Sequence, residues 1–421
     1  MTRARVLFGV AAAVASCGVA MAQPASFTPL GDLAGGSFLS RARALSGDGT
    51  VAAGGGTGAS GTEGVRWVGA SAAAGLGNLA GGGLGSEGYA ISGDGSVVFG
   101  NVTDSVGNSL PARWTSAGWM PLGFLATGGY SGRAFACSAD GLAACGEQLY
   151  QPPSGGGPPP FPITQAFRWT MSGGMEPLGV PPGISGTTPG SLCTARAMSA
   201  DGSVVVGYAS DVGPYRPWRW THATGMVDLS NGTLNARSLG CSSDGSVVVG
   251  GILSGEPFVW TSAGGLRTLG LLPGYTSGAG TDVSSDGGRI LGILVGSPNA
   301  AAVWDRALGG GGSWQTVQTA LSAAGVSTAG WTLSQATAMT DDGRTIVGYG
   351  TDPSGNTEAW KAVLPRPCLV DFDGMGGVGV PDIFEFLNAW FAGDPRADYN
   401  GVDGITVQDI FDFLNAWFVG C

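Results

Sequence analysis

The sequence predicts an all-β protein built from repeated four-stranded sheets, and three observations carry this prediction. The phrase small-x-Asp-Gly, followed by a mainly apolar run and a glycine, recurs seven times between residues 46 and 350. Each copy is followed by a tryptophan before the next copy begins. The composition agrees, because 79 of the 421 residues are glycine and 24 are proline, against usual shares of about 7% and 5%. Many short strands joined by tight turns account for all three.

Each repeat contains four short extended segments. In the fifth repeat they are residues 226–229, 236–241, 246–250 and 257–261. Asp-Gly between two apolar runs is a strong hairpin signal, and we expect a type I′ turn, which needs positive φ at both central residues. The seven aspartates, which we interpret as turn residues, are Asp48, Asp94, Asp140, Asp201, Asp244, Asp286 and Asp342.

The tryptophans are interpreted as core residues between neighbouring repeats, with a stacking platform for sugars as the alternative. They are Trp67, Trp114, Trp169, Trp220, Trp260, Trp304 and Trp360, and in four repeats an arginine precedes the tryptophan directly. A unit of about 45 residues cannot bury both faces of its sheet, so it must stack on copies of itself. Radial stacking over residues 23–364 predicts a seven-bladed β-propeller of four-stranded blades. A right-handed spiral or a pair of β-sandwiches remains as the alternative.

The N-terminal segment is typical of an export signal. Arg3 and Arg5 precede an apolar run over residues 6–21, and Ala20-Met21-Ala22 has the small-x-small pattern of a cleavage site. We therefore expect residues 1–22 to be a secretory signal peptide and the protein to be secreted, extracellular or attached to the cell surface. Lipidation of Cys17 is the alternative. No other segment reaches the ~20 apolar residues of a membrane span, so no transmembrane span is expected.

Cysteine usage points to disulfides. Removal of the signal leaves six cysteines, an even number that suits an exported protein, although sequence alone permits 15 pairings. The expected pairs are Cys368 with Cys421 at the two ends of the C-terminal module, Cys137 with Cys145 around one hairpin, and Cys193 with Cys241 across neighbouring repeats.

The repeats resemble a known family. The segments MSADGSVVVG (198–207), AFRWT (166–170) and GMEPLG (174–179) are similar to the HAF-type extracellular repeats of bacterial secreted proteins. The resemblance covers about 340 residues. It implies an exported, non-catalytic protein and names no ligand.

The C-terminal region, residues 365–421, is a tandem module of different composition. Residues 371–391 and 398–418 align at an offset of 27 residues. Each copy begins with an acidic, glycine-rich loop and continues with apolar residues at helical spacing, so we expect two packed helices. Oxygen-rich loops that enter a helix are typical calcium sites.

This arrangement resembles the dockerin domain, in particular the bacterial type bracketed by cysteines. The resemblance implies calcium held by Asp371, Asp373 and Asp382 in the first loop and by Asp398, Asn400, Thr406 and Asp409 in the second. Met375 and Val402 replace a carboxylate, and Asp403 stands where the loop needs glycine. Fewer carboxylates weaken binding, and the alternative is a loop held by the disulfide and helix packing.

Charge and residue usage limit the function classes. The net charge is −11 with no basic run, which argues against nucleic acid and anionic lipid as partners. His222 is the single histidine and has no nearby nucleophile, and no carboxylates form a recognisable catalytic pair. We therefore expect no catalytic residues and no enzyme, with a glycoside hydrolase as the alternative.

The expected function is a secreted, non-catalytic β-propeller that is tethered through the dockerin-like domain to a cohesin-like protein or to the cell surface. A role in extracellular polysaccharide binding or breakdown is one alternative, and a structural surface protein is another.

Overall fold

The computed structural model describes residues 24–69, 71–125, 128–151, 161–188, 190–308, 311–366, 368–373, 378–400 and 404–419. The expected signal peptide with Cys17, the loop residues Met375, Val402 and Asp403, and the terminal Cys421 lie outside these residues.

The all-β prediction is confirmed, since strands dominate the described chain. Each of the first four repeats forms an antiparallel group of four strands. The strands are β2 (Gly35–Leu45), β3 (Val51–Gly58), β4 (Gly61–Val68) and β5 (Ala74–Gly75); β6 (Ser86–Ile91), β7 (Val98–Thr103), β8 (Ser109–Thr115) and β9 (Gly118–Pro121); β10 (Gly129–Cys137), β11 (Ala143–Tyr150), β12 (Ile163–Thr170) and β13 (Gly174–Pro177); and β14 (Leu192–Met198), β15 (Val204–Ser210), β16 (Arg216–Thr221) and β17 (Gly225–Asp228).

The later repeats continue this order. Their strands are β18 (Ala236–Cys241), β19 (Val247–Ile252), β20 (Pro257–Thr261) and β21 (Gly265–Thr268); β22 (Ser277–Val283), β23 (Arg289–Val295), β24 (Ala300–Arg306) and β25 (Gly312–Thr316); and β26 (Thr332–Met339), β27 (Thr345–Thr351) and β28 (Thr357–Val363). The N-terminal strand β1 (Ser26–Pro29) pairs antiparallel with β28. Helix α1 (Val317–Ala323) follows β25.

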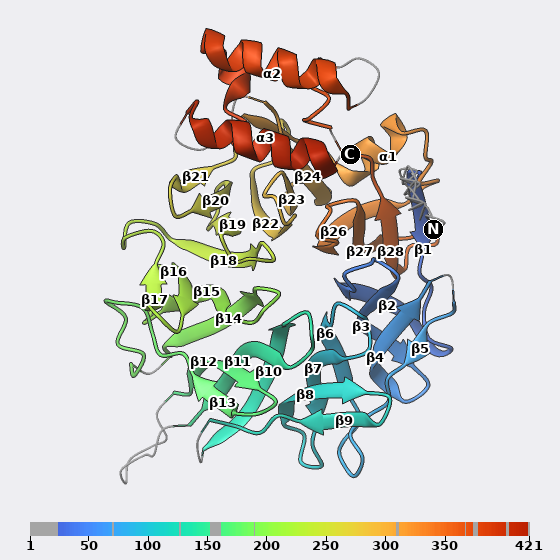
Figure 1. Cartoon of the computed structure of the whole chain (residues 1–421). Helices are drawn as coiled ribbons and strands as arrows, with labels where there is room; N and C mark the ends of the chain where they lie inside the picture. The colour runs from blue at the N-terminus through green and yellow to red at the C-terminus, as the bar shows by residue number, and fades with distance from the viewer. Residues whose placement is uncertain are drawn as a thin grey trace, which may run out of the picture.

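The first and last repeats lie side by side. Besides the pairing of β1 with β28, β2 forms a parallel bridge to β28 through Leu39 and Thr357. Figure 1 shows the blue β2 next to the orange β27 and β28, while the sheets between them follow one another around the molecule. The ends of the repeat array are therefore in direct contact.

The Asp-Gly hairpins share one hydrogen-bond network in all seven repeats. In the first, the Ser46 hydroxyl donates to Asp48 Oδ1 at 2.7 Å, and the Val51 amide donates to Ser46 Oγ at 2.9 Å. Gly49 has a φ of +71°, whereas Asp48 is not among the residues of positive φ. The predicted type I′ turn is therefore wrong. The observed hairpin, in which the Gly49 amide donates to the Ser46 carbonyl, has its positive φ at the glycine alone.

Neighbouring turns are also joined through their backbones. In five of the seven repeats the residue before the turn aspartate donates its amide to the equivalent carbonyl of the next repeat: Gly47 to Gly93, Gly93 to Ala139, Ala139 to Ala200, Ala200 to Ser243, and Ser285 to Asp341. These bonds are 2.7–2.9 Å long. They fix the turns of successive repeats against one another.

The arginine before the tryptophan forms a further bond between repeats. Its guanidinium donates to the carbonyl of the turn glycine in the next repeat: Arg66 to Gly95, Arg113 to Gly141, Arg168 to Gly202 and Arg219 to Gly245, at 2.7–3.4 Å. Lys361 lies in the same register of the last repeat and donates to Gly49 of the first. In the sixth repeat Arg289 donates to Gly343 instead. We call these bonds the inter-repeat clamps.

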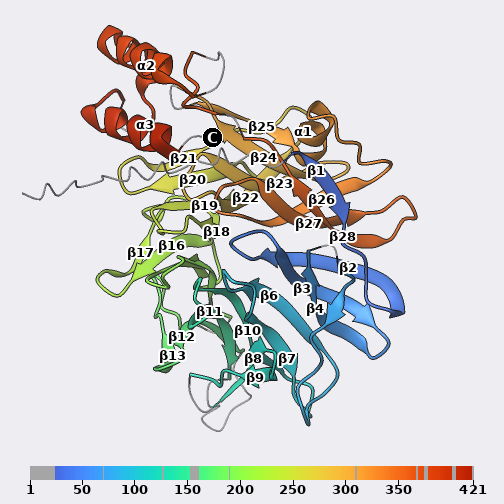
Figure 2. The same cartoon turned by 45° about the vertical axis from the view of Figure 1, so that its right-hand side comes forward.

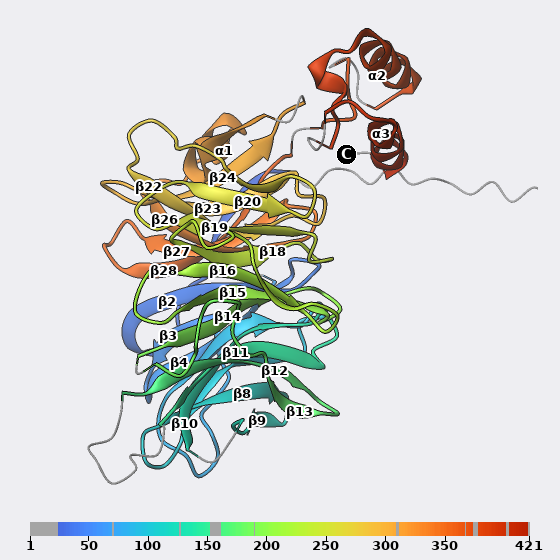
Figure 3. The ribbon, with the colours of Figure 1, turned by 90° about the vertical axis from the view of Figure 1, so that its left-hand side faces the viewer.

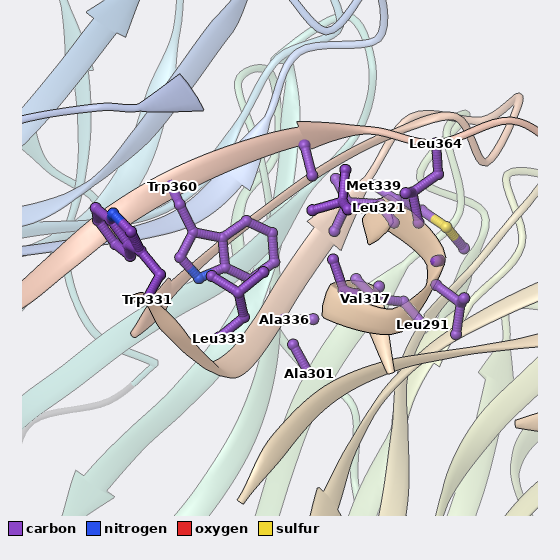
Figure 4. Close-up of a cluster of buried hydrophobic side chains, with 14 residues drawn as sticks. Leu291, Ala301, Val317, Leu321, Trp331, Leu333, Ala336, Met339, Trp360 and Leu364 are labelled. Carbon is purple, nitrogen blue, oxygen red and sulfur yellow. The ribbon is translucent and has the colours of Figure 1, made fainter. Parts of the chain in front are cut away.

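The tryptophans are core residues, as expected, with one difference in register. Trp67, Trp169, Trp220, Trp304 and Trp360 are buried, and Trp114 and Trp260 are half-buried at the edges of core clusters. In the last repeat Ala362 occupies the position of Trp67, and Trp360 lies two residues earlier on the same face of the strand. Figure 4 shows Trp360 and Leu333 of the last sheet next to each other, in a cluster that also contains Val317 and Leu321 of α1.

Two of the expected disulfides are absent, because Cys137, Cys145, Cys193 and Cys241 are free thiols. Cys137 and Cys145 belong to different core clusters on opposite faces of one hairpin. Cys193 lies near the start of β14 and Cys241 at the end of β18, so the two lie at opposite ends of neighbouring first strands. Burial raises the pKa of Cys137 and of Cys241 to about 12. Cys368 is disulfide-bonded, and its expected partner Cys421 lies outside the described residues.

The C-terminal module contains the two expected helices, α2 (Val380–Ala392) and α3 (Val407–Val419), with a 3₁₀ turn (Pro395–Ala397) between them. Figures 2 and 3 show both helices outside the sheets. Phe386 and Phe413, which are equivalent residues of the two copies, stack at 4.1 Å between ring centroids. The Trp390 indole donates to the Thr406 carbonyl, and the equivalent Trp417 indole donates to the Gly379 carbonyl. The module therefore has internal two-fold symmetry.

The clamps give a testable prediction. Arg219→Met keeps much of the aliphatic packing and removes the bond to Gly245, so we expect it to lower the free energy of unfolding by about 1.5–3 kcal/mol. Urea unfolding followed by tryptophan fluorescence measures the change. Arg396→Met, which removes an exposed pair with Asp394, serves as the control and should cost less than about 1 kcal/mol. Equal effects of the two substitutions would show that the clamp contributes nothing specific.

Candidate functional site

The first acidic loop brings together its three predicted ligands. Asp371, Asp373 and Asp382 each place a carboxylate oxygen within 4.8 Å of the others. Asp382 is buried at the start of α2, where its two oxygens accept the amides of Asp373 and Gly379 at 3.1 and 2.7 Å. Burial raises its pKa, but these amide donors outweigh burial and hold the pKa below the usual value. Asp382 is therefore an anion at neutral pH.

Asp371 supplies the observation that bears on a metal. Its Oδ1 atom is buried and has no hydrogen-bond partner among the described residues. A buried carboxylate oxygen without a donor is costly, and a hard cation would satisfy it. The donor set of the first loop therefore fits calcium.

The second loop repeats part of this geometry. Asp409 is buried, and its oxygens accept the amides of Asn400 and Thr406 at 3.1 and 2.7 Å, as those of Asp382 do in the first loop. The Thr406 hydroxyl also donates to Asp409 Oδ2 at 3.0 Å. The structure thus brings Asn400, Thr406 and Asp409 together, and Asp398 follows the 3₁₀ turn at the start of the same loop.

A second candidate site was missed by the sequence analysis. Every first strand (β2, β6, β10, β14, β18, β22 and β26) has a one-residue register shift three residues before its turn serine or threonine. Such β-bulges re-aim side chains. The bulged residues are Arg43, Tyr89, Phe135, Arg196, Leu239, Thr281 and Thr337, and all except Leu239 line a cavity of about 230 Å³. Each bulged residue lies three positions before the turn serine or threonine, and this constant spacing could have identified them from the sequence.

Asp282 is the one carboxylate among the described residues that line this cavity. The equivalent residue of the other repeats is alanine or glycine, for example Ala44 and Gly240. Its oxygens accept the amides of Val283 and Met339 at 2.9 and 2.8 Å. Burial raises its pKa to about 7, so protonated and charged forms coexist near neutral pH.

His222 lies outside both sites. Its side chain is exposed, packs edge-on against Trp220 and lies 3.8 Å from Glu176.

None of the helices in the described part of the chain has the length and apolarity that crossing a bilayer requires.

Solved structures similar to this chain include two enzymes. A prolyl endopeptidase structure is 14% identical with a TM-score of 0.51, and the match covers 82% of this chain and 50% of the endopeptidase, so the chain spans about half of that protein. Oligogalacturonate lyase from Vibrio parahaemolyticus is 10% identical with a TM-score of 0.50, over 82% of this chain and 98% of the lyase. The β-propeller domain of the Trilobed protease from Pyrococcus furiosus is 9% identical, with a TM-score of 0.38 over 63% of this chain and 78% of that domain. No family model and no curated protein sequence matches the chain.

These likenesses describe the fold, which is of the β-propeller type. They also correct one expectation. The chain was expected not to be an enzyme. The lyase and the endopeptidase, which are similar to it in fold, are enzymes. The fold and the lack of a catalytic motif therefore give no ground for excluding catalysis, and that expectation is wrong.

Asp282 gives a prediction on pH. Because its pKa is higher in the folded than in the unfolded protein, its ionisation lowers stability as the pH rises from about 4 to 7. Asp282→Asn cannot ionise, so the stability of this variant relative to the native protein should increase across that window. Unfolding free energies at pH 4.5, 6 and 7.5 measure the trend. Asp104→Asn is the control, since the pKa of Asp104 is lowered and its effect should be flat above pH 5. A flat profile for Asp282→Asn would contradict the assignment.

Proposed function

We propose that this protein is an exported β-propeller that is tethered through its C-terminal dockerin-like module to a cohesin-like protein at the cell surface. The observation that carries the proposal is a symmetric apolar surface on α2 and α3. Three pairs of equivalent residues are exposed to almost the same extent: Val380 and Val407 (56% and 58%), Phe384 and Phe411 (63% and 57%), and Phe391 and Phe418 (78% and 77%).

Exposed phenylalanines of this kind are typical of interaction surfaces. The inward sides of both helices are filled by the module's own core around Phe386 and Phe413, so the outward residues are not needed for its folding. Both copies of the tandem module keep these outward positions apolar, and this supports contact with a partner.

The finer architecture is part of the proposal: seven four-stranded blades that close into a ring. Support comes from the contacts between the first and last repeats. Strand β1 completes the sheet of β26–β28, Lys361 clamps Gly49, and the Thr337 hydroxyl donates to the Ala42 carbonyl at 2.9 Å.

The module is proposed to bind calcium through Asp371, Asp373 and Asp382, and through Asp398, Asn400, Thr406 and Asp409. The buried Asp371 oxygen without a donor supports the first loop. Calcium would cross-link the loop to the start of each helix and so orient the apolar surface.

The propeller is proposed to take part in extracellular polysaccharide binding or breakdown, with a structural surface role as the other candidate. The cavity supports the former, because it brings aromatic, cationic and carboxylate side chains together in one place that is open to solvent.

The docking proposal predicts loss of partner binding on removal of the exposed phenylalanines. The double variant Phe384→Ser and Phe411→Ser should weaken binding of the full chain at least 10-fold in biolayer interferometry against a panel of purified cohesins. Val106→Ser removes an equally exposed apolar residue from a sheet loop and should have no effect. Failure of the native protein to bind any cohesin of the panel would count against the proposal.

Calcium binding is tested separately by titration calorimetry and thermal unfolding of the full chain. We expect calcium to raise the melting temperature of the C-terminal module and Asp371→Asn to weaken binding at least 10-fold, because the charge on the unpartnered oxygen is lost. Asp104→Asn, a surface substitution outside the module, is the control. No heat and no change of melting temperature at millimolar calcium would discard the metal site.

A further inference from the structure

Five arginines lie on four of the first strands, and two of them line the cavity. Arg41 and Arg43 lie on β2, Arg133 on β10, Arg196 on β14 and Arg237 on β18. Arg43 and Arg196 line the cavity, and the other three lie two residues before the bulged residue of their strand. The chain holds only 19 basic residues and a net charge of −11, so five arginines here make a local excess of positive charge. We call these five residues the arginine cluster.

Aromatic rings hold the cavity arginines in place. Arg43 lies over Tyr89 at 5.2 Å, Tyr89 packs edge-on against Phe135 at 5.4 Å, and Arg196 lies over Phe135 at 4.2 Å. These four residues are the bulged residues of four consecutive first strands. They form a continuous cation–aromatic–aromatic–cation row along the cavity wall.

Two of the arginines that do not line the cavity, Arg41 and Arg237, stack in the same way. Arg41 lies over Tyr349 at 5.6 Å, and Arg237 lies over Tyr208 at 5.2 Å and Tyr215 at 4.1 Å. Stacking through the planar face leaves the N–H edge of a guanidinium able to donate to an anion. The four stacked arginines are thus ordered before any ligand arrives, which lowers the entropic cost of binding.

Most of this positive charge has no internal partner. Glu87 pairs with Arg43 at 2.7 Å, but no carboxylate of the described residues lies within 4 Å of Arg133, Arg196 or Arg237. The buried Nε atoms of Arg41 and Arg237 also have no acceptor in the described structure. Four of the five arginines thus have no carboxylate partner among the described residues, and an anionic ligand would pair with guanidinium groups of this kind.

We propose that the arginine cluster binds an acidic oligosaccharide, whose carboxylate or sulfate groups accept hydrogen bonds from the guanidinium edges. This inference rests on the polysaccharide role in the proposed function and specifies the charge of the ligand. Planar carboxylates match the guanidinium fork with two parallel bonds, and the aromatic row offers apolar edges to a sugar ring.

The dimensions set how the ligand lies. A cavity of about 230 Å³ is smaller than the roughly 300–1,000 Å³ of pockets that enclose drug-sized ligands. It therefore accepts one terminal acidic sugar between Arg43 and Arg196, and the rest of the chain extends past Arg133 and Arg237. Asp282 on β22 lines the same cavity as Arg43 and Arg196. Burial raises the pKa of its carboxyl group, so its protonated form adds no negative charge beside the ligand.

The experiment is titration calorimetry of the full chain with three probes of matched length: an alginate oligosaccharide, a chondroitin sulfate oligosaccharide and cellohexaose. We expect binding of an acidic probe that weakens as NaCl rises, because salt screens the interaction. Arg196→Met and Arg237→Met should each weaken binding at least 10-fold while the aromatic contact of the side-chain stem is kept. Arg396→Met on the C-terminal module removes an exposed arginine and should bind as the native protein does.

Circular dichroism and the melting temperature establish that each variant folds. If Arg196→Met does not fold, the exposed Arg133→Met takes its place. Preference for alginate or for the sulfated probe identifies which acid group the cluster takes. Tight binding of cellohexaose instead overturns the inference while polysaccharide binding stands. No binding of either acidic probe, or affinity no greater than for free acetate or sulfate, overturns it as well. Cohesin binding is measured in a separate experiment, so a failure of the docking proposal can be distinguished from a failure of oligosaccharide binding.

Discussion

The repeat array depends on the carbonyl group of the turn glycine, because this group accepts the hydrogen bond that links one repeat to the next. In each small-x-Asp-Gly turn the aspartate is fully engaged by the serine or threonine hydroxyl and a backbone amide, and the glycine takes a positive φ. This conformation leaves the glycine carbonyl available, and in six of the seven turns an arginine or lysine of the preceding repeat donates to it. One local motif therefore forms the hairpin and the acceptor for its neighbour. Because the donor is a cation, each such bond is stronger than a bond between neutral groups.

The cavity follows from this anchoring. The first strands are fixed at their turn ends by the clamps and by the backbone bonds between turns, such as Gly93 to Ala139. Three residues before each turn the strand bulges, and six of the seven bulged side chains line one cavity. Their identities are free to differ, because the bulge is held by the backbone and not by the side chain. The repeats thus supply a constant frame for variable residues, and Asp282 and the arginines are examples of that variation.

What could be predicted from sequence was local. The Asp-Gly hairpins, the short strands and the apolar spacing of α2 and α3 are encoded within a few residues, and these were found. The grouping of the strands was not, because the segment 226–229, expected in the fifth repeat, overlaps β17 of the preceding sheet. Features that depend on pairing between strands were not. The shift of Trp360 relative to Trp67, the free thiols of Cys137 and Cys145 and the seven bulges require a register that spacing alone does not define. The ligands of the first acidic loop were found because their spacing along the chain is itself the signal.

The two proposed binding surfaces have opposite chemistry and share no residue. The apolar surface lies on α2 and α3, and the arginine cluster lies on the first strands of the sheets. Arg306 joins the module to the sheets by donating to the Asn400 carbonyl and stacking over Tyr399, and Leu308 packs against the module core. These contacts leave the exposed phenylalanines uncovered. A protein that is attached through the apolar surface of α2 and α3 can therefore still bind a ligand with the arginine cluster. Attachment to a partner on the cell surface raises the effective concentration of the cavity for a ligand on that surface.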